Sequence, residues 1–205
     1  MKSYPYRIPA VLCLVLGLAA CGSSPPTNFY RLTPAVAYAP GGQEPSVGIG
    51  PIDIPEFLNR NALVYARGGN QLQLADTERW AEPLEYGVKR VVGLNLSQLL
   101  HTQNLRFFPW DLRQAPDYGV SINIMDLDAS EGQAILVADW QVYRPGDGSA
   151  ITRRISRFSQ PLASGQPVPG ALPAAYSALL YELSETIAEA IRAEQQGRPG
   201  GAAKQ

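Results

Sequence analysis

The first twenty residues most constrain what this chain can fold into, because their pattern predicts that they are removed before the rest folds. Lys2 and Arg7 precede an apolar run over residues 8–20, which only Pro9 interrupts. A short positive start, an apolar run of about 7–15 residues and small residues at its end are typical of a secretory signal peptide. A bilayer span needs about 20 apolar residues, so the run predicts a cleaved signal over residues 1–20 and not a membrane helix.

The residue that follows this run is a cysteine. Leu18-Ala19-Ala20-Cys21 resembles the lipobox of bacterial lipoproteins, in which the cysteine thiol receives a diacylglycerol and the bond before it is cut. Several acyl chains on one residue anchor a protein stably, since each buried methylene contributes about 0.8 kcal/mol. The alternative is an ordinary secretory signal with an incidental cysteine. We expect lipidation of Cys21 and a tether over residues 21–28, which Pro25 and Pro26 extend.

No free thiol would remain for other chemistry. Cys13 leaves with the signal and Cys21 carries the lipid, so a disulfide, a cysteine nucleophile and a zinc–cysteine cluster are all excluded. Removing the first 20 of 205 residues leaves 185, which suits one domain with a core large enough to fold alone. We expect a single domain over residues 29–194 and a disordered, Gly- and Ala-rich tail over residues 195–205.

The charge balance gives no support for binding to nucleic acid. Once Lys2 and Arg7 leave with the signal, 15 of the 17 basic residues remain, against 18 acidic ones. A nucleic-acid-binding domain usually carries a strongly basic patch.

Apolar residues in the predicted domain recur at two different spacings, one typical of helices and one typical of strands. Residues 83–100 and 173–192 carry one-sided apolar stripes at helical spacing, each with a proline near its start. Alternating or β-branched segments predict strands at 29–32, 47–54, 62–67, 71–74, 105–108, 118–127, 133–143 and 151–158. The fold class that follows is α/β, with α+β as the alternative: a single mixed β-sheet packed by two amphipathic helices.

Two positions in these elements stand out. Asn95 falls inside the apolar stripe of the first helix, so its amide needs a partner if it is buried. The strand at 151–158 is polar on both faces and carries Arg153, Arg154 and Arg157. Charge of this kind blunts unwanted pairing at a sheet edge, so we predict an edge strand. Contact with anionic lipid or an acidic partner is the alternative for these arginines.

The sequence predicts no catalytic residue, no metal site and no cofactor. His101 is the single histidine, and no Gly-x-Ser-x-Gly nucleophile turn accompanies it. We interpret it as a surface residue near a helix C-terminus, where the helix dipole favours it. Asp126, Asp128 and Glu131 could approach a cation, but their spacing matches no EF-hand loop and suits a solvated turn.

Aromatic residues lie at strand ends and beside loops. Most of them suit a core, but some could be partner contacts, because Trp, Tyr and Arg dominate interface energies. Phe57 and Trp80 are the preferred exposed candidates, since each lies in a polar, loop-like stretch. The full set is Tyr30, Phe57, Tyr65, Trp80, Phe107, Phe108, Trp110 and Trp140.

The order of several short blocks resembles one known family. The blocks are Asn28-Phe29-Tyr30-Arg31-Leu32, Val47-Gly48-Ile49-Gly50-Pro51-Ile52-Asp53-Ile54-Pro55-Glu56-Phe57-Leu58-Asn59-Arg60, Arg79-Trp80-Ala81-Glu82-Pro83-Leu84, Asn95-Leu96 and Ala138-Asp139-Trp140. Together they resemble the ABC-type transport auxiliary lipoproteins, the family of the paraquat-inducible lipoprotein PqiC, over nearly all of the mature chain.

This resemblance implies a role and no reaction. Members resemble outer-membrane lipoproteins that partner an MCE-domain protein anchored in the inner membrane, sometimes with ABC transporter subunits, and the system moves lipids or other hydrophobic molecules. Gly22 follows Cys21, where Asp would favour retention in the inner membrane, so we expect the outer membrane, with the domain facing the periplasm. A homo-oligomeric ring is compatible with this role, because a tubular partner favours cyclic symmetry.

Under this role, two polar, proline-punctuated segments are expected to contact the partner. They span residues 51–60 and 76–83, and the proposed contacts are Pro55, Phe57, Arg60, Trp80 and Glu82. The alternative is that Pro55, Trp80 and Pro83 only fix loop geometry and cap the core. Three other roles stay open: a lipid carrier, a periplasmic hydrolase, which the single histidine disfavours, and an assembly lipoprotein for an outer-membrane protein.

Overall fold

The computed structural model describes residues 25–35, 41–68, 70–162 and 169–197, and these residues form two β-sheets. The smaller sheet has the order β1-β4-β3, from β1 (Asn28–Tyr30), β3 (Ala62–Gly68) and β4 (Gln71–Trp80). The larger sheet has the order β5-β2-β6-β7-β8, from β2 (Val47–Asp53), β5 (Leu105–Phe107), β6 (Tyr118–Ser130), β7 (Gln133–Tyr143) and β8 (Ala150–Pro161). In the larger sheet, β2 pairs in parallel with both β5 and β6. Strand β7 pairs antiparallel with β6 on one side and with β8 on the other.

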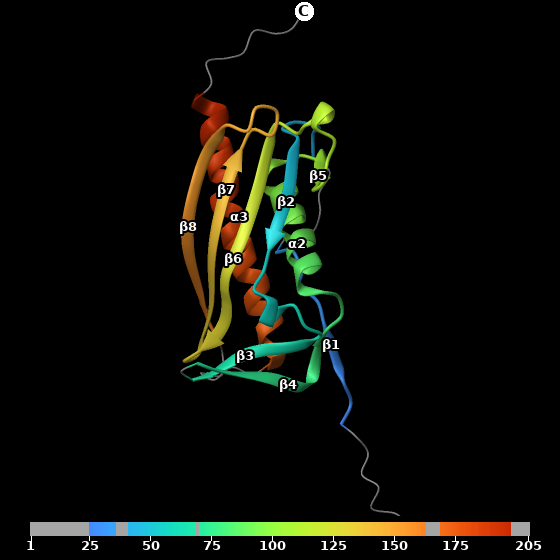
Figure 1. Cartoon of the computed structure of the whole chain (residues 1–205), viewed down its shortest axis with the longest axis vertical. Helices are drawn as coiled ribbons and strands as arrows, with labels where there is room; N and C mark the ends of the chain where they lie inside the picture. The colour runs from blue at the N-terminus through green and yellow to red at the C-terminus, as the bar shows by residue number, and fades with distance from the viewer. Residues whose placement is uncertain (1–24, 36–40, 69, 163–168, 198–205) are drawn as a thin grey trace, which may run out of the picture.

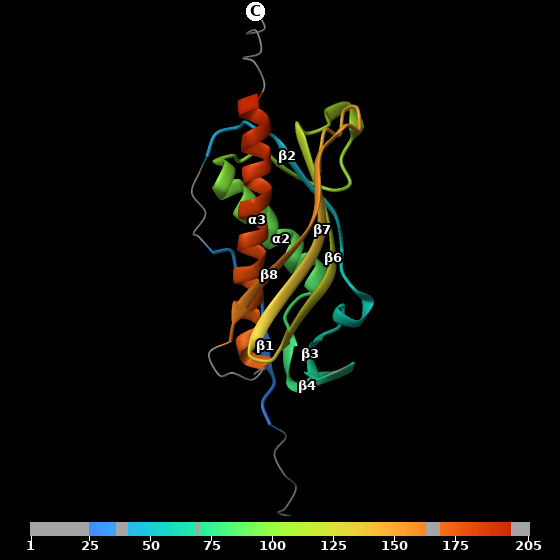
Figure 2. The ribbon, with the colours of Figure 1, turned by 90° about the vertical axis from the view of Figure 1, so that its left-hand side faces the viewer.

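Two helices cover one face of the five-stranded sheet, as Figure 2 shows. They are α2 (Leu84–Leu100) and α3 (Leu172–Gly197), which also pack against each other. Short 3-10 turns lie at Glu56–Leu58 (η1), Leu112–Gln114 (η2) and Pro169–Ala171 (η3). The α/β class and the mixed pairing are confirmed, but the strands divide between two sheets and do not form the single sheet predicted.

The alternation of β7 explains how the core forms. Its inward residues are fully buried under the helices, whereas the residues between them are partly exposed on the other face. Strand side chains alternate between the two faces of a sheet, so this burial pattern shows that the helices cover only one face of β7. The inward set is Ala134, Leu136, Ala138, Trp140 and Val142.

Several predicted boundaries hold and others need correction. Helix α2 starts directly after Pro83 and ends at Leu100, and its C-cap residue His101 adopts the left-handed conformation with φ of 53°. Strand β8 lies at an edge of its sheet, as its arginines predicted. Strand β4, in contrast, does not end at Leu74 but continues to Trp80. Helix α3 continues to Gly197, into the predicted tail. The predicted signal, Cys21 and residues 198–205 lie outside the described residues.

The long extension of β4 comes from a second pairing partner. Its first half forms a hairpin with β3, with Leu74 opposite Val64, and its last residues pair in parallel with β1, with Trp80 opposite Tyr30. The register with β3 shifts between these two parts. The three-stranded sheet lies at one end of the molecule, and the C-terminal end of α3 lies at the other (Figure 1).

A carboxylate joins the two sheets. Asp128 of β6 accepts hydrogen bonds from the backbone N–H of Ala66 in β3, at 2.7 Å, and of Ala129, at 2.6 Å. Burial, together with the nearby charge of Asp126, raises the pKa of Asp128, although its two hydrogen bonds act in the opposite direction. Asp128 therefore ties the small sheet to the end of the larger one.

Candidate functional site: a clamped N-terminal segment and an open sheet face

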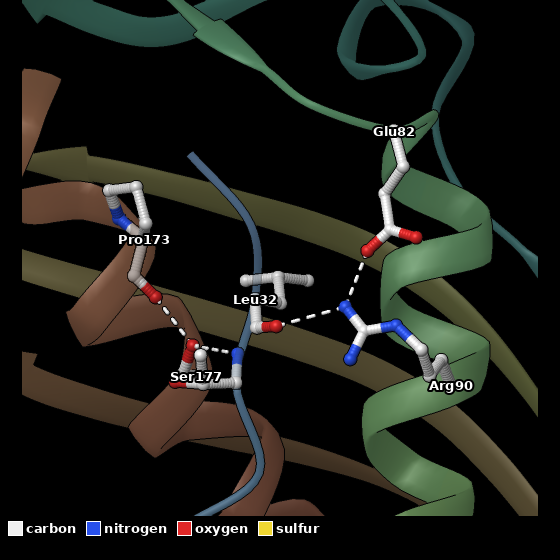
Figure 3. A network of polar contacts seen from close by, with 6 residues as sticks. Leu32, Glu82, Arg90, Pro173 and Ser177 are labelled. Carbon is white, nitrogen blue, oxygen red and sulfur yellow. Dashed lines mark hydrogen bonds and ion pairs between the residues drawn. The ribbon is translucent and has the colours of Figure 1, made fainter. Parts of the chain in front are cut away.

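The segment that follows β1 lies between the two helices (Figure 3). Arg90 of α2 donates from Nη2 to the carbonyl oxygen of Leu32 at 3.0 Å, and the same nitrogen forms an ion pair with Glu82. The Leu32 side chain is fully buried in the core. One guanidinium, seven residues into α2, thus holds the N-terminal segment together with Glu82, which lies two residues before that helix begins.

Helix α3 holds the same segment from its other side. The backbone N–H of Thr33 donates to Ser177 Oγ at 3.1 Å, and this hydroxyl in turn donates to the carbonyl oxygen of Pro173 at 2.6 Å. We call the set Leu32, Thr33, Glu82, Arg90 and Ser177 the N-terminal clamp. It fixes the chain to both helices only two residues after β1 ends, so β1 is held to the helical layer of the domain.

Trp80 is a core residue, so the prediction that it is exposed is wrong. Its side chain is 6% exposed, and its ring stacks on that of Tyr176 with centroids 6.4 Å apart and planes 28° apart. Its backbone N–H donates to the carbonyl oxygen of Asn61 at 2.7 Å. The physical reason is the pairing of β4 with β1, which turns Trp80 towards α3. The burial of Trp80 agrees with the alternative interpretation, in which this residue caps the core.

The other predicted contact residues divide into two groups. Glu82 is half-buried and already paired with Arg90 inside the clamp. Pro55 and Phe57 are half-buried and Arg60 is exposed, all in or beside η1, which follows β2. The predicted segment 76–83 is hydrogen-bonded, through Trp80, to Asn61, one residue beyond the end of the predicted segment 51–60. Pro55, Phe57 and Arg60 are the three that remain accessible.

A polar groove lies close to η1 in sequence, on the sheet face opposite the helices. It encloses about 400 Å³, and β2, β6, β7 and β8 all contribute to it. Arg153 spans part of it, since its Nε and Nη2 donate to the two carboxylate oxygens of Asp139 at 3.1 and 2.6 Å. These hydrogen bonds lower the pKa of Asp139 and keep it ionised. The lining includes Pro51, Asp53, Ser121, Asn123, Asp139, Gln141 and Arg153.

Apolar side chains accompany these polar groups. Ile155 of β8 lies opposite Asp139, so it shares this face of the sheet, and it is 66% exposed. Met125, where the register between β6 and β7 shifts, is also exposed. No described helix covers this face, as Figure 2 shows. We call the groove together with Ile155 the open sheet face.

A second exposed patch lies where α2 meets β5. Tyr86, Phe107 and Phe108 are all exposed there. Lys89 lies over the Phe107 ring, with Nζ 5.7 Å from its centroid, and donates to the carbonyl oxygen of Phe108 at 2.7 Å. The sequence analysis assigned Phe107 and Phe108 to a set that mostly suits a core. The shortness of this strand, which Pro109 follows closely and which has no apolar alternation, was the signal that could have placed them at the surface.

The structure places the titratable residues that the sequence analysis singled out. His101 is exposed at the C-terminal end of α2, as predicted. Within the described ranges, no group of three or more His, Cys, Asp or Glu side chains is placed to hold a metal ion. Asp126, Asp128 and Glu131 do not form such a group, since Asp128 is committed to the backbone of β3.

None of the described helices is long and apolar enough to cross a bilayer.

The arrangement of the strands and helices is similar to that of two crystal structures. One, of an uncharacterized protein, has a TM-score of 0.63 at 16% sequence identity and covers 82% of this chain and 99% of its own. The other, of a protein from Xanthomonas campestris, has a TM-score of 0.64 at 14% identity and covers 83% and 99%. At such identities the likeness shows a shared fold. Among curated proteins, no sequence matches this one.

The sequence also matches a family model described as an ABC-type transport auxiliary lipoprotein component. The match spans residues 30–188, well over half of the chain, and includes the N-terminal clamp and the open sheet face. The earlier resemblance of the sequence blocks is thereby confirmed. The chain belongs to the ABC-type transport auxiliary lipoprotein family.

Proposed function

We propose that this protein is a non-enzymatic outer-membrane lipoprotein of an MCE/ABC-type intermembrane lipid transport system. In this role, lipid on Cys21 holds the domain on the periplasmic side of the outer membrane, and the domain docks the MCE-domain partner that reaches it from the inner membrane. The family supports the transport role, and Gly22 supports sorting to the outer membrane.

The observation that carries the docking role is the open sheet face. A five-stranded sheet with helices on one side leaves its other side exposed, and here that side carries Ile155 beside a polar groove. The groove begins at Pro51, only a few residues before Phe57 and Arg60. Aromatic and arginine side chains at the edge of a mixed polar and apolar surface are typical of protein interfaces.

The lining of the groove disfavours the lipid-carrier role. An acyl chain needs an apolar cavity, because each buried polar group without a partner costs free energy. Asp53, Asn123 and the Asp139–Arg153 pair all line this groove. They suit the backbone and polar side chains of a protein partner better than they suit an acyl chain.

The proposal includes self-association into a cyclic ring, with ABC transporter subunits on the inner-membrane side of the system. A tubular partner offers the same contact repeatedly around its axis, which a ring of identical docking faces matches.

Site-specific photocrosslinking in the native envelope tests the docking face. A photoreactive amino acid replaces Phe57 or Ile155 on the proposed face, and Glu189, exposed on α3, serves as the control position. We expect an MCE-domain protein to be captured from positions 57 and 155 and not from position 189. Capture of that protein from position 189 alone would assign docking to the helical face and contradict the proposal.

A further inference from the structure

The three-stranded sheet exposes large apolar side chains that the docking role does not use. Phe29 of β1 is 66% exposed, and Leu72 and Leu74 of β4 are 41% and 48% exposed. Leu72 and Leu74 are two residues apart, so they project from the same face of their strand. Three such side chains on one small sheet form what we call the apolar end of the domain.

The tether limits which part of the domain can approach the membrane. Eight residue steps separate Cys21 from Phe29, which span at most about 29 Å even when fully extended. Helix α3 alone has 26 residues, about 39 Å, and its C-terminal end lies at the opposite end of the molecule (Figure 1). The tether is therefore too short to bring the far end to the bilayer with the apolar end turned away.

The N-terminal clamp makes this end rigid with respect to the rest of the domain. Leu32, three residues after Phe29, is buried and held by Arg90, and Thr33 is held by Ser177. In addition, Ala81 donates from its backbone N–H to the carbonyl oxygen of Tyr30 at 2.7 Å. Because β1 is fixed to the helices a few residues after the tether, the lipid and the apolar end approach the bilayer together.

Resting on the proposed anchorage at Cys21, we infer that Phe29, Leu72 and Leu74 insert into the surface of the bilayer that holds the lipid. The occupant of this apolar surface is the membrane itself, and the lipid chains and the protein side chains form one continuous contact. The exposed charges nearby have both signs, with Arg31 and Arg67 against Asp76. Burial of apolar area, more than attraction to anionic headgroups, therefore drives the contact.

The predicted processing gives a clean labelling experiment. In the mature lipoprotein, Cys13 is removed and Cys21 is blocked by its lipid, so an engineered cysteine is the one free thiol. Leu72→Cys and Phe29→Cys report on the apolar end. Ile155→Cys matches Phe29 in exposure on the open sheet face, and Gly146→Cys lies exposed in the β7–β8 turn at the far end (Figure 1).

Each variant is labelled with an environment-sensitive nitrobenzoxadiazole dye. The full lipoprotein is then reconstituted into phosphatidylethanolamine–phosphatidylglycerol vesicles, with or without lipids that carry a doxyl quencher near the headgroup. We expect labels at positions 29 and 72 to shift to the blue and lose more than half of their emission to the quencher. Labels at positions 146 and 155 should keep the emission of an aqueous dye.

Two controls separate failure of this inference from failure of the anchor. Vesicle flotation and the intact mass show whether Cys21 carries lipid, and thermal unfolding shows that each variant folds. If the protein floats but labels at positions 29 and 72 stay aqueous, the inference is overturned and the proposed function stands. Quenching at position 155 in place of position 72 would also overturn it. A protein without lipid that does not float would contradict the anchor and this inference together.

Discussion

The indole ring of Trp80 stacks on the phenol ring of Tyr176, with ring centroids 6.4 Å apart. This contact joins the last residue of β4 to the first turns of α3, which are far apart in the sequence. It therefore connects the small sheet, which lies next to the predicted tether, to the helical layer of the domain.

Replacing Trp80 with Ala should destabilise the domain strongly. A buried aromatic side chain leaves a cavity when it is removed, which costs about 3–5 kcal/mol. Urea unfolding of the mature chain measures this change in the free energy of unfolding. Tyr86→Ala, at an exposed aromatic of α2, is the control and should change it by no more than about 0.5 kcal/mol. A loss below about 1 kcal/mol for Trp80→Ala would contradict the core role.

Tyr176→Phe should leave stability unchanged or raise it by about 1 kcal/mol, because the buried hydroxyl gains no compensating hydrogen bond. Tyr176 Oη is buried without a hydrogen-bond partner among the described residues. Burial, with the charges of Asp128 and Asp126, raises the pKa of Tyr176 above its ordinary value of 10.0.

The same substitution has a signature at alkaline pH. A tyrosine whose pKa is raised by folding stays protonated in the native state, while the unfolded chain loses that proton near pH 10. The wild type therefore loses stability as the pH rises above about 10, and Tyr176→Phe removes this part of the loss. Unfolding curves at pH 8 and pH 11 should show a smaller decrease for the variant. An identical decrease in both proteins would contradict the buried environment of the hydroxyl.

The N-terminal clamp predicts a local effect of Ser177→Ala. Loss of the hydroxyl leaves the Thr33 N–H without its acceptor, which costs about 1 kcal/mol. Hydrogen exchange should become faster at the Thr33 amide and stay unchanged in β7. Arg113→Gln breaks an ion pair with Asp111 whose arginine is almost fully exposed, and it should change neither exchange nor stability measurably. Equal exchange at Thr33 in Ser177→Ala and wild type would show that the clamp does not hold this segment.

Two neighbouring glycines should respond differently to alanine. A Cβ on Gly41 would collide with the backbone carbonyl of His101 and lie 2.8 Å from the Thr102 nitrogen, whereas a Cβ on Gly42 would meet nothing closer than 3.8 Å. Because backbone atoms cannot move aside cheaply, Gly41→Ala should cost about 1–3 kcal/mol. Gly42→Ala should be tolerated within about 0.5 kcal/mol. Thermal unfolding of the two variants side by side tests this difference, and equal melting temperatures would contradict it.

Sequence patterns among neighbouring residues correctly predicted the strand and helix boundaries that depend on neighbouring residues alone. The alternation of residues 133–143 gave both ends of β7, and Pro83 placed the start of α2, because strand faces and helix starts depend on neighbouring residues. Asn95 followed its prediction only in part. It is buried, and its Oδ1 accepts a hydrogen bond from the Ala35 N–H at 3.3 Å, but its Nδ2 has no partner among the described residues.

Contacts between segments that are far apart in the sequence determine the features of the fold that local sequence patterns could not predict. The polar stretch Asp76-Thr77-Glu78 read as a loop, but pairing with β1 makes the end of it part of a strand and buries Trp80. The division into two sheets follows from the same pairing. For the candidate site, Phe57 and Arg60 were proposed from the sequence, whereas the groove was not, because four separate strands contribute to it.

Crosslinking in the native envelope, followed by isolation of the full lipoprotein and mass spectrometry of its partners, tests the central claim most directly. The account predicts that an MCE-domain protein is recovered together with a chain that carries lipid on Cys21. Recovery of a β-barrel protein alone, or of bound lipid with no MCE-domain protein, would contradict the docking role and favour the assembly or lipid-carrier alternative.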